Sequence, residues 1–250
     1  MSSPASSKTW PRDAFNIGAT ILFAIGAVAI AIAAILVYLA VAIKSGQIDM
    51  HHRRVTIMTE LTGELAIYVP VSAYLLSFLP AIAKCSLRDL GIRTPGPREI
   101  GIGLLGALLM HLAVDPSGAI VSALTHRQDT EAAIALLKEI KTPFETYFFI
   151  AIALVFAPIF EELSFRVFLF NSFARYASVP IAAVLSGVVF GVVHAASAWQ
   201  LVTISIPLAL GGIVLAFVYA WSRNYWSSVI THSAFNAVGV TLHFVFHFKA

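Results

Sequence analysis

The stretch IGATILFAIGAVAIAIAAILVYLAVAI, residues 17–43, decides the class of this protein. It contains no charged side chain, and it exceeds the roughly 20 apolar residues that a helix needs to cross a bilayer. The apolar part of a secretory signal peptide is only about 7–15 residues long. The stretch therefore predicts a membrane-spanning helix or signal anchor, and not a cleaved signal peptide.

The composition of the whole chain agrees with a membrane protein. Its 250 residues are 59% hydrophobic and only 12% charged, whereas soluble domains carry about 25% charged residues. The mean hydropathy is +0.86, which excludes a soluble globular protein, a disordered chain and a disulfide scaffold. The net charge of +3 comes from scattered Lys and Arg residues. Because no basic stripe with interleaved aromatics appears, no nucleic-acid partner is expected.

A polar tail (residues 1–13) precedes the first span. Further apolar stretches come after it. The stretch that begins near Ile100 is interrupted by Asp-Pro-Ser-Gly at 115–118, which predicts a helix end there. We expect an all-α fold, a polytopic membrane helix bundle with about seven or eight transmembrane helices. Besides the stretch near Ile100, the expected spans are 61–83, 144–175, 179–196, 201–221 and 226–247.

Two segments of the chain need a more particular interpretation. The stretch 144–175 is roughly 48 Å long at 1.5 Å per residue, more than a bilayer core requires. It must tilt, bend or break, and Pro158 marks a candidate position. The polar segment 126–142 has a helical pattern of apolar residues and is expected to lie at the membrane interface.

Strongly polar residues occur inside three apolar stretches in the C-terminal half. A charge in the middle of a membrane costs several kcal/mol, so each such residue suggests a function. The stretches are APIFEELSFRVFLF (157–170), with Glu161, Glu162 and Arg166; SGVVFGVVHAA (186–196), with His194; and VITHSAFNAVG (229–239), with His232 and Asn236.

The spacing of these residues predicts how they meet. Glu162 and Arg166 are four residues apart on one helix face and can pair, which leaves Glu161 about 100° around the helix and facing a cavity. Glu161 and His194 are equally far from the turn near residues 177–178, so an antiparallel hairpin puts them at one depth. His232 and Asn236 lie closer to their own turn near Asn224, so their expected depth differs by roughly 7–13 Å, and a tilt or break must bring them level.

A carboxylate, two imidazoles and an amide inside a membrane fit peptide hydrolysis. Glu161 and a neutral His194 can share the deprotonation of a water molecule held between them. His232 and Asn236 lie on one helical face and can stabilise the oxyanion that forms at the carbonyl carbon.

The three motifs together resemble those of the CAAX protease and bacteriocin-processing (CPBP) family, which includes the Ras-converting CAAX endopeptidases. They are Glu-Glu-x-x-x-Arg at 161–166, Phe-x-x-x-His at 190–194 and His-x-x-x-Asn at 232–236. The resemblance covers about residues 144–240, so we expect an N-terminal tail with accessory helices over 1–143 and a catalytic helix core over 144–250. One departure is Val167, where the family commonly has glycine.

The resemblance implies a glutamate-dependent intramembrane endopeptidase. Glu161 and His194 correspond to the residues that activate water, and His232 and Asn236 correspond to the oxyanion site. Glu162 and Arg166 correspond to supporting positions. Members of the family cleave near the C-terminus of prenylated proteins, or process or protect against peptides. The implied partners are membrane lipids and a membrane-anchored protein or peptide substrate. The protein is expected to be an integral, multi-pass membrane protein. Its membrane would be the plasma membrane if the organism is prokaryotic.

Three alternatives remain open on the same residues. Glu161, Glu162, His194 and His232 could bind Zn²⁺ with a water molecule in the open position. We favour metal-free catalysis without a cofactor, because no His-Glu-x-x-His occurs and Arg166 beside the carboxylates disfavours a divalent cation. The cluster could instead serve a proton-coupled transporter, or the chain could be a non-catalytic membrane scaffold or immunity factor.

Overall fold

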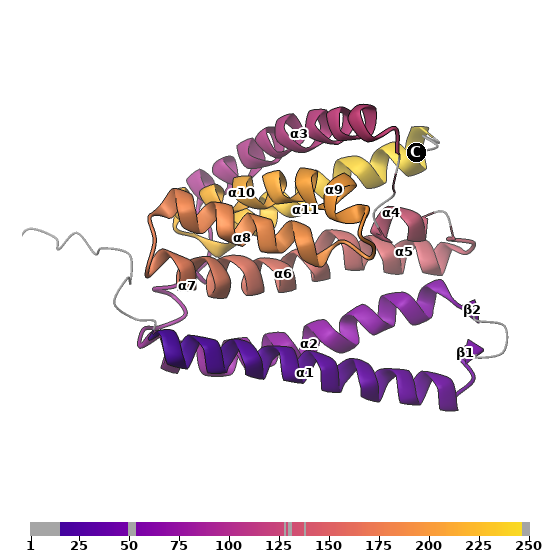
Figure 1. Ribbon diagram of the computed structural model, residues 1–250, viewed down its shortest axis with the longest axis horizontal. Coiled ribbons are helices and arrows are strands. Elements are labelled where there is room, and N and C mark those ends of the chain that lie inside the picture. Colours follow the sequence, from indigo (N-terminus) through magenta and orange to yellow (C-terminus); the bar gives the residue numbers. More distant parts are fainter. Residues whose placement is uncertain (1–15, 50–53, 128, 130–131, 138, 247–250) are drawn as a thin grey trace, which may run out of the picture.

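The computed structural model describes residues 16–49, 54–127, 129, 132–137 and 139–246, so the polar tail at 1–13 lies outside the described residues. The described part is almost entirely helical (Figure 1). The helices before the long broken helix are α1 (Ile17–Lys44), α2 (Ile57–Ala83), α3 (Pro97–Thr125) and α4 (Ala132–Leu137). The helices after it are α8 (Val179–Val193), α9 (Gln200–Thr203), α10 (Ser205–Ser222) and α11 (Tyr225–Phe246).

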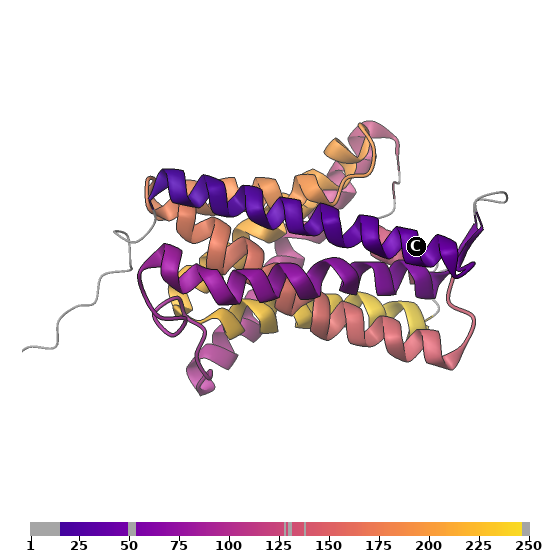
Figure 2. The same cartoon turned by 90° about the horizontal axis from the view of Figure 1, so that it is seen from below.

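The first two helices form a hairpin that lies against one side of the bundle (Figure 1; seen from below in Figure 2). A two-residue antiparallel pairing of β1 (Ile48–Asp49) with β2 (Arg54–Val55) joins them. The Tyr38 hydroxyl on α1 is within 2.7 Å of Thr62 Oγ1 on α2. Helices α3, α8, α10 and α11 form the other side, and the broken helix over 143–174 runs between the two parts.

The predicted all-α membrane bundle is confirmed. By length and composition, five helices of the described chain can cross a membrane: Ile17–Lys44, Ile57–Ala83, Pro97–Thr125, Pro143–Ala174 and Gln200–Ser222. Their outward side chains suit a lipid environment, as Leu22 and Val37 on α1 are 70% and 65% exposed.

Five helices of the described chain meet these length and composition criteria, whereas seven or eight crossings were predicted. The expected span 179–196 is the 15-residue α8, which at 1.5 Å per residue reaches only about 22 Å. Helix α11 has 22 residues and carries His232 and Asn236, and it is not among these five candidate spans of the described chain.

The interruption predicted at 115–118 is wrong, because α3 continues through these residues to Thr125. Pro116 removes only one backbone hydrogen bond. Before the proline, Met110 and Val114 are buried in a cluster with Leu215 of α10, and after it Val121 is buried as well. This burial supports the helix on both sides of the proline. Ser117 Oγ also donates to the carbonyl of Val114 at 2.8 Å.

The long stretch 144–175 breaks its α-helical pattern on both sides of Pro158. The helix begins as α5 (Pro143–Ala151), becomes π-helical in η1 (Ile152–Phe156), returns to α6 (Ala157–Glu162), is π-helical again in η2 (Leu163–Phe170) and ends in α7 (Asn171–Ala174). Each π-helical turn changes which carbonyls are bonded within the helix, and such turns are frequent at functional sites. Both glutamates lie on the short α6 between them.

Helices α8 and α10 approach closely because glycines face each other at the contact. A Cβ added to Gly187 would lie 2.6 Å from Ile213 Cγ1, and one added to Gly212 would lie 2.8 Å from Gly187 Cα. Neither position can hold a larger side chain unless the helices move apart.

We therefore expect Gly187→Val to destabilise the bundle by about 1–3 kcal/mol through overpacking. Thermal unfolding in detergent, followed by circular dichroism, should show a lower midpoint than wild type. Gly101→Val is the matched control, because nothing lies within 4 Å of a Cβ at Gly101 on α3. Equal midpoints for the two variants would contradict the proposed tight contact.

Candidate active site

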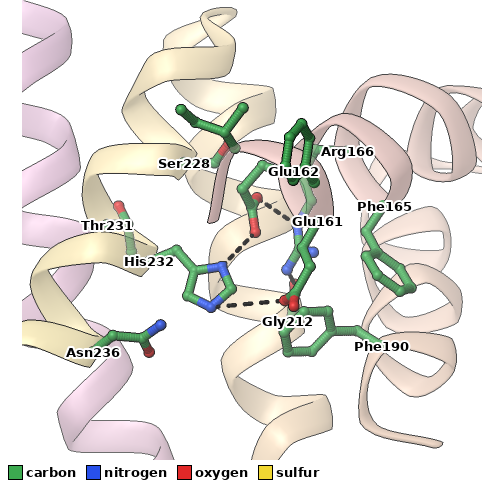
Figure 3. Close-up of polar contacts among 12 residues, drawn as sticks. Glu161, Glu162, Phe165, Arg166, Phe190, Gly212, Ser228, Thr231, His232 and Asn236 are labelled. Atoms are coloured by element: carbon green, nitrogen blue, oxygen red, sulfur yellow. Dashed lines mark hydrogen bonds and ion pairs between the residues drawn. The ribbon is translucent and has the colours of Figure 1, made fainter. Parts of the chain in front are cut away.

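The polar residues of the three motifs converge on the carboxylate of Glu161. Its Oε2 atom lies 3.9 Å from His194 Nε2 at the end of α8 and 3.9 Å from His232 Nε2 on α11. Figure 3 shows Glu161 and His232 facing each other across this centre. The side chains are mostly shielded, with 12% of Glu161, 20% of His194 and 7% of His232 exposed.

The difference in depth expected for His232 is removed by the turn that precedes α11. This turn is buried: Asn224 is 0% exposed and its Nδ2 donates to the carbonyl of Arg93 at 3.1 Å. The backbone nitrogen of Tyr225 donates to the carbonyl of Gly91 at 2.9 Å. Because the loop before α3 covers this turn, α11 begins inside the bundle, and His232 reaches the depth of Glu161.

Glu162, Arg166 and His232 form a buried network behind the centre. Arg166 Nε lies 3.0 Å from Glu162 Oε2, which confirms the predicted pair, and both side chains are 0% exposed. Glu162 Oε1 lies 3.1 Å from His232 Nδ1. Arg166 also donates to the carbonyl of Gly212 at 3.1 Å, and its Cζ lies 4.8 Å from the centre of the Phe190 ring. Both oxygens of Glu162 therefore face positively polarised groups.

His194 is held in one orientation by its own helix. It is the C-terminal cap of α8, and its Nδ1 lies 2.6 Å from the carbonyl oxygen of Phe190. A carbonyl oxygen only accepts hydrogen bonds, so Nδ1 carries the proton. In the neutral ring, Nε2 then presents a lone pair, and this is the atom that faces Glu161.

Asn236 lies one turn beyond His232 on α11, and its amide nitrogen is turned toward His232 in Figure 3. Its Nδ2 donates to the carbonyl of Ala153 at 2.9 Å. Ala153 belongs to the π-helical segment η1, so the irregular turn supplies the acceptor that orients this amide. An amide nitrogen has two hydrogens, and this contact uses one of them.

One residue of the site could not be anticipated from the motifs. Tyr68, on α2 of the N-terminal hairpin, donates its hydroxyl to Glu161 Oε1 at 2.8 Å. A tyrosine in an apolar stretch carries no specific signal, because tyrosines are also common at membrane interfaces.

The predicted zinc ligands are not equally available. Glu162 is fully buried, with one oxygen in an ion pair with Arg166 and the other in contact with His232. Of the four, Glu161, His194 and His232 are left. Within the described part of the chain, no group of three or more His, Cys, Asp and Glu side chains is arranged to hold a metal ion.

Comparison with known proteins agrees with the motifs. Residues 143–238 match the family model described as type II CAAX prenyl endopeptidase Rce1-like. The resemblance is confirmed over this segment. It runs from the start of α5 into α11 and includes every residue of the three motifs. Val167, where the family commonly has glycine, is 0% exposed and packs in the main core cluster.

The chain is also similar to the UPF0177 protein YxdF of Lactococcus lactis subsp. lactis (strain IL1403). The two are 31% identical over 85 residues, which are 34% of this chain and 44% of that protein. The aligned part is thus less than half of the relative. No solved structure matches this chain significantly. With its five candidate spans and the matched segment, the chain is an integral, multi-pass membrane protein in contact with lipids.

Proposed function

We propose that this protein is an intramembrane endopeptidase that hydrolyses a peptide bond of a membrane-associated protein or peptide. The observation that carries the proposal is the position of Glu161 Oε2, 3.9 Å from the Nε2 atoms of both His194 and His232. The match of residues 143–238 to a CAAX prenyl endopeptidase family supports it. The catalytic core comprises residues 144–250, with the helices of 1–143 in contact with it.

Glu161 and His194 activate the attacking water. Both Glu161 Oε2 and the neutral His194 Nε2 are acceptors, and one water molecule between them can donate a hydrogen to each. The water oxygen attacks the carbonyl carbon of the substrate while its proton moves to Glu161. As the carbon–nitrogen bond breaks, Glu161 passes this proton to the leaving amine.

His232 and Asn236 stabilise the oxyanion of the tetrahedral intermediate. Asn236 contributes the second hydrogen of its amide nitrogen, since the first is donated to Ala153. His232 donates from Nε2 only when its ring carries two protons, because Nδ1 already donates to Glu162. Glu162 accepts the Nδ1 proton, and the negative charge of Glu161, 3.9 Å from Nε2, stabilises the doubly protonated ring. Low solvent exposure strengthens each of these interactions.

The mechanism needs no cofactor, so chelators should leave the rate unchanged. The measurement is cleavage of a fluorogenic membrane-anchored peptide by the purified protein, before and after prolonged dialysis against a strong chelator. Activity that disappears with the chelator and returns with added Zn²⁺ would contradict metal-free catalysis and support Glu161, His194 and His232 as ligands.

The transporter and scaffold alternatives are tested with Asn236→Ala. We expect this variant to lose about 10²–10³-fold in kcat, the usual cost of removing one oxyanion donor. A transporter would tolerate the change and show pH-driven flux in vesicles. Cleavage by wild type and Asn236→Ala at equal rates would remove Asn236 from the mechanism.

A further inference from the structure

The hydroxyl of Tyr68 connects the N-terminal hairpin to the glutamate of the site. Tyr68 lies within α2, and its Oη donates to Glu161 Oε1 at 2.8 Å. Its ring packs against that of Phe160, the neighbour of Glu161, with ring centres 5.4 Å apart. Tyr68 lies outside residues 143–238, so the family match does not include this contact.

We propose that Tyr68 is a positioning residue, which holds the Glu161 carboxylate in the orientation that activates water. The inference rests on the proposed function of Glu161 as the general base. A positioning role for Tyr68 makes helix α2 a part of the active site, in addition to its role in packing.

The two oxygens of Glu161 have different neighbours, and this supports the proposal. Oε1 accepts the hydrogen bond from Tyr68, whereas Oε2 faces His194 and His232. An ionised carboxylate has no hydrogen to donate, so the tyrosine must be the donor. With Oε1 engaged, the proton taken from water goes to Oε2, the oxygen that faces the water site. Without the tyrosine, rotation of the carboxylate group would exchange the two oxygens.

The hydroxyl of Tyr68 is itself held in place by packing on both sides. Toward the start of α2, Ile57 and Leu61 pack in a cluster with Phe149 and Ile152 of the broken helix. Toward its end, Leu75 and Leu79 belong to the main core cluster, together with Leu163 and Val167. Helix α2 is thus anchored to the broken helix before and after Tyr68, which gives the rigid support that a positioning group requires.

The test compares Tyr68→Phe with Tyr74→Phe in the full-length protein, using the fluorogenic membrane-anchored peptide. Tyr74 lies on the same helix, and its hydroxyl contacts the carbonyl of Phe23 at 3.4 Å, away from the site. We expect Tyr68→Phe to lower kcat about 10–100-fold with little change in KM, because a misplaced base weakens only the chemical step. Tyr74→Phe should keep the kcat of wild type.

A second measurement uses stability and does not depend on a substrate. Removal of the Tyr68 hydroxyl should lower the Tm in the wild-type background and have a smaller effect in the Glu161→Ala background, since the partner is then absent. Equal losses of Tm in both backgrounds would overturn the inference that the hydroxyl acts through Glu161.

The kinetic outcomes separate this inference from the proposed function. If Tyr68→Phe keeps the wild-type kcat while Glu161→Gln is inactive, the role of Tyr68 is refuted and the proposed function stands. If Glu161→Gln is as active as wild type, or if wild type cleaves nothing in a broad panel of membrane-anchored peptides, both are overturned.

Discussion

Glu161→Gln is expected to reduce peptide cleavage by about 10²–10⁴-fold, the range that a positioned general base contributes. The amide keeps the size of the side chain and can still accept the hydrogen bond from Tyr68. It has no basic oxygen to take a proton from water. The measurement is the initial rate of cleavage in proteoliposomes, at substrate concentrations that separate kcat from KM.

Glu60→Gln provides the matched control for this prediction. Glu60 lies in the first turn of α2 on the exposed surface of the protein, outside the site. The Glu60→Gln variant should cleave the peptide at the rate of wild type. Equal rates for Glu161→Gln and Glu60→Gln would contradict the assignment of Glu161 as the base.

Arg166→Met should have the largest effect on stability, because it leaves Glu162 buried without its cation. Both side chains are 0% exposed and 3.0 Å apart, and breaking such a pair costs about 3–5 kcal/mol. The sole cysteine, Cys85, offers a measurement of unfolding with a thiol-reactive fluorophore. Burial raises the pKa of its thiol in the folded state, so labelling should accelerate on unfolding.

The double variant Glu162→Leu/Arg166→Met is the informative control for this effect. Replacing both members of a buried ion pair by apolar side chains is often nearly neutral. We therefore expect the double variant to recover much of the lost Tm. It should cleave slowly all the same, because His232 Nδ1 has lost its acceptor. A double variant less stable than Arg166→Met would show that the buried pair is not the source of the loss.

The sequence allowed the membrane class and the local geometry of the site to be predicted. A long apolar stretch indicates directly that its helix is surrounded by lipid. The pairing of Glu162 with Arg166 follows from helical periodicity alone. Both inferences depend on residues that are close together in the chain.

Features that depend on distant parts of the chain could not be predicted. The contact between His232 and Glu162 joins α11 to α6. The level of His232 is set by the buried turn at Asn224, which the loop before α3 covers. The contact of Tyr68 with Glu161 joins α2 to the core. The helix end predicted at Pro116 was wrong because packing against α10 supports a helix that the local sequence disfavours.

The most direct test of the central claim is a single-turnover cleavage in heavy-oxygen water, with the enzyme in excess over a membrane-anchored peptide. If Glu161 activates water, mass spectrometry should find one heavy-oxygen atom in the new C-terminal carboxylate of the product and none in Glu161. If the Glu161 carboxylate instead attacks the substrate and the resulting anhydride is opened by water at Glu161, the label would appear on Glu161 and be absent from the product. That result would contradict the account.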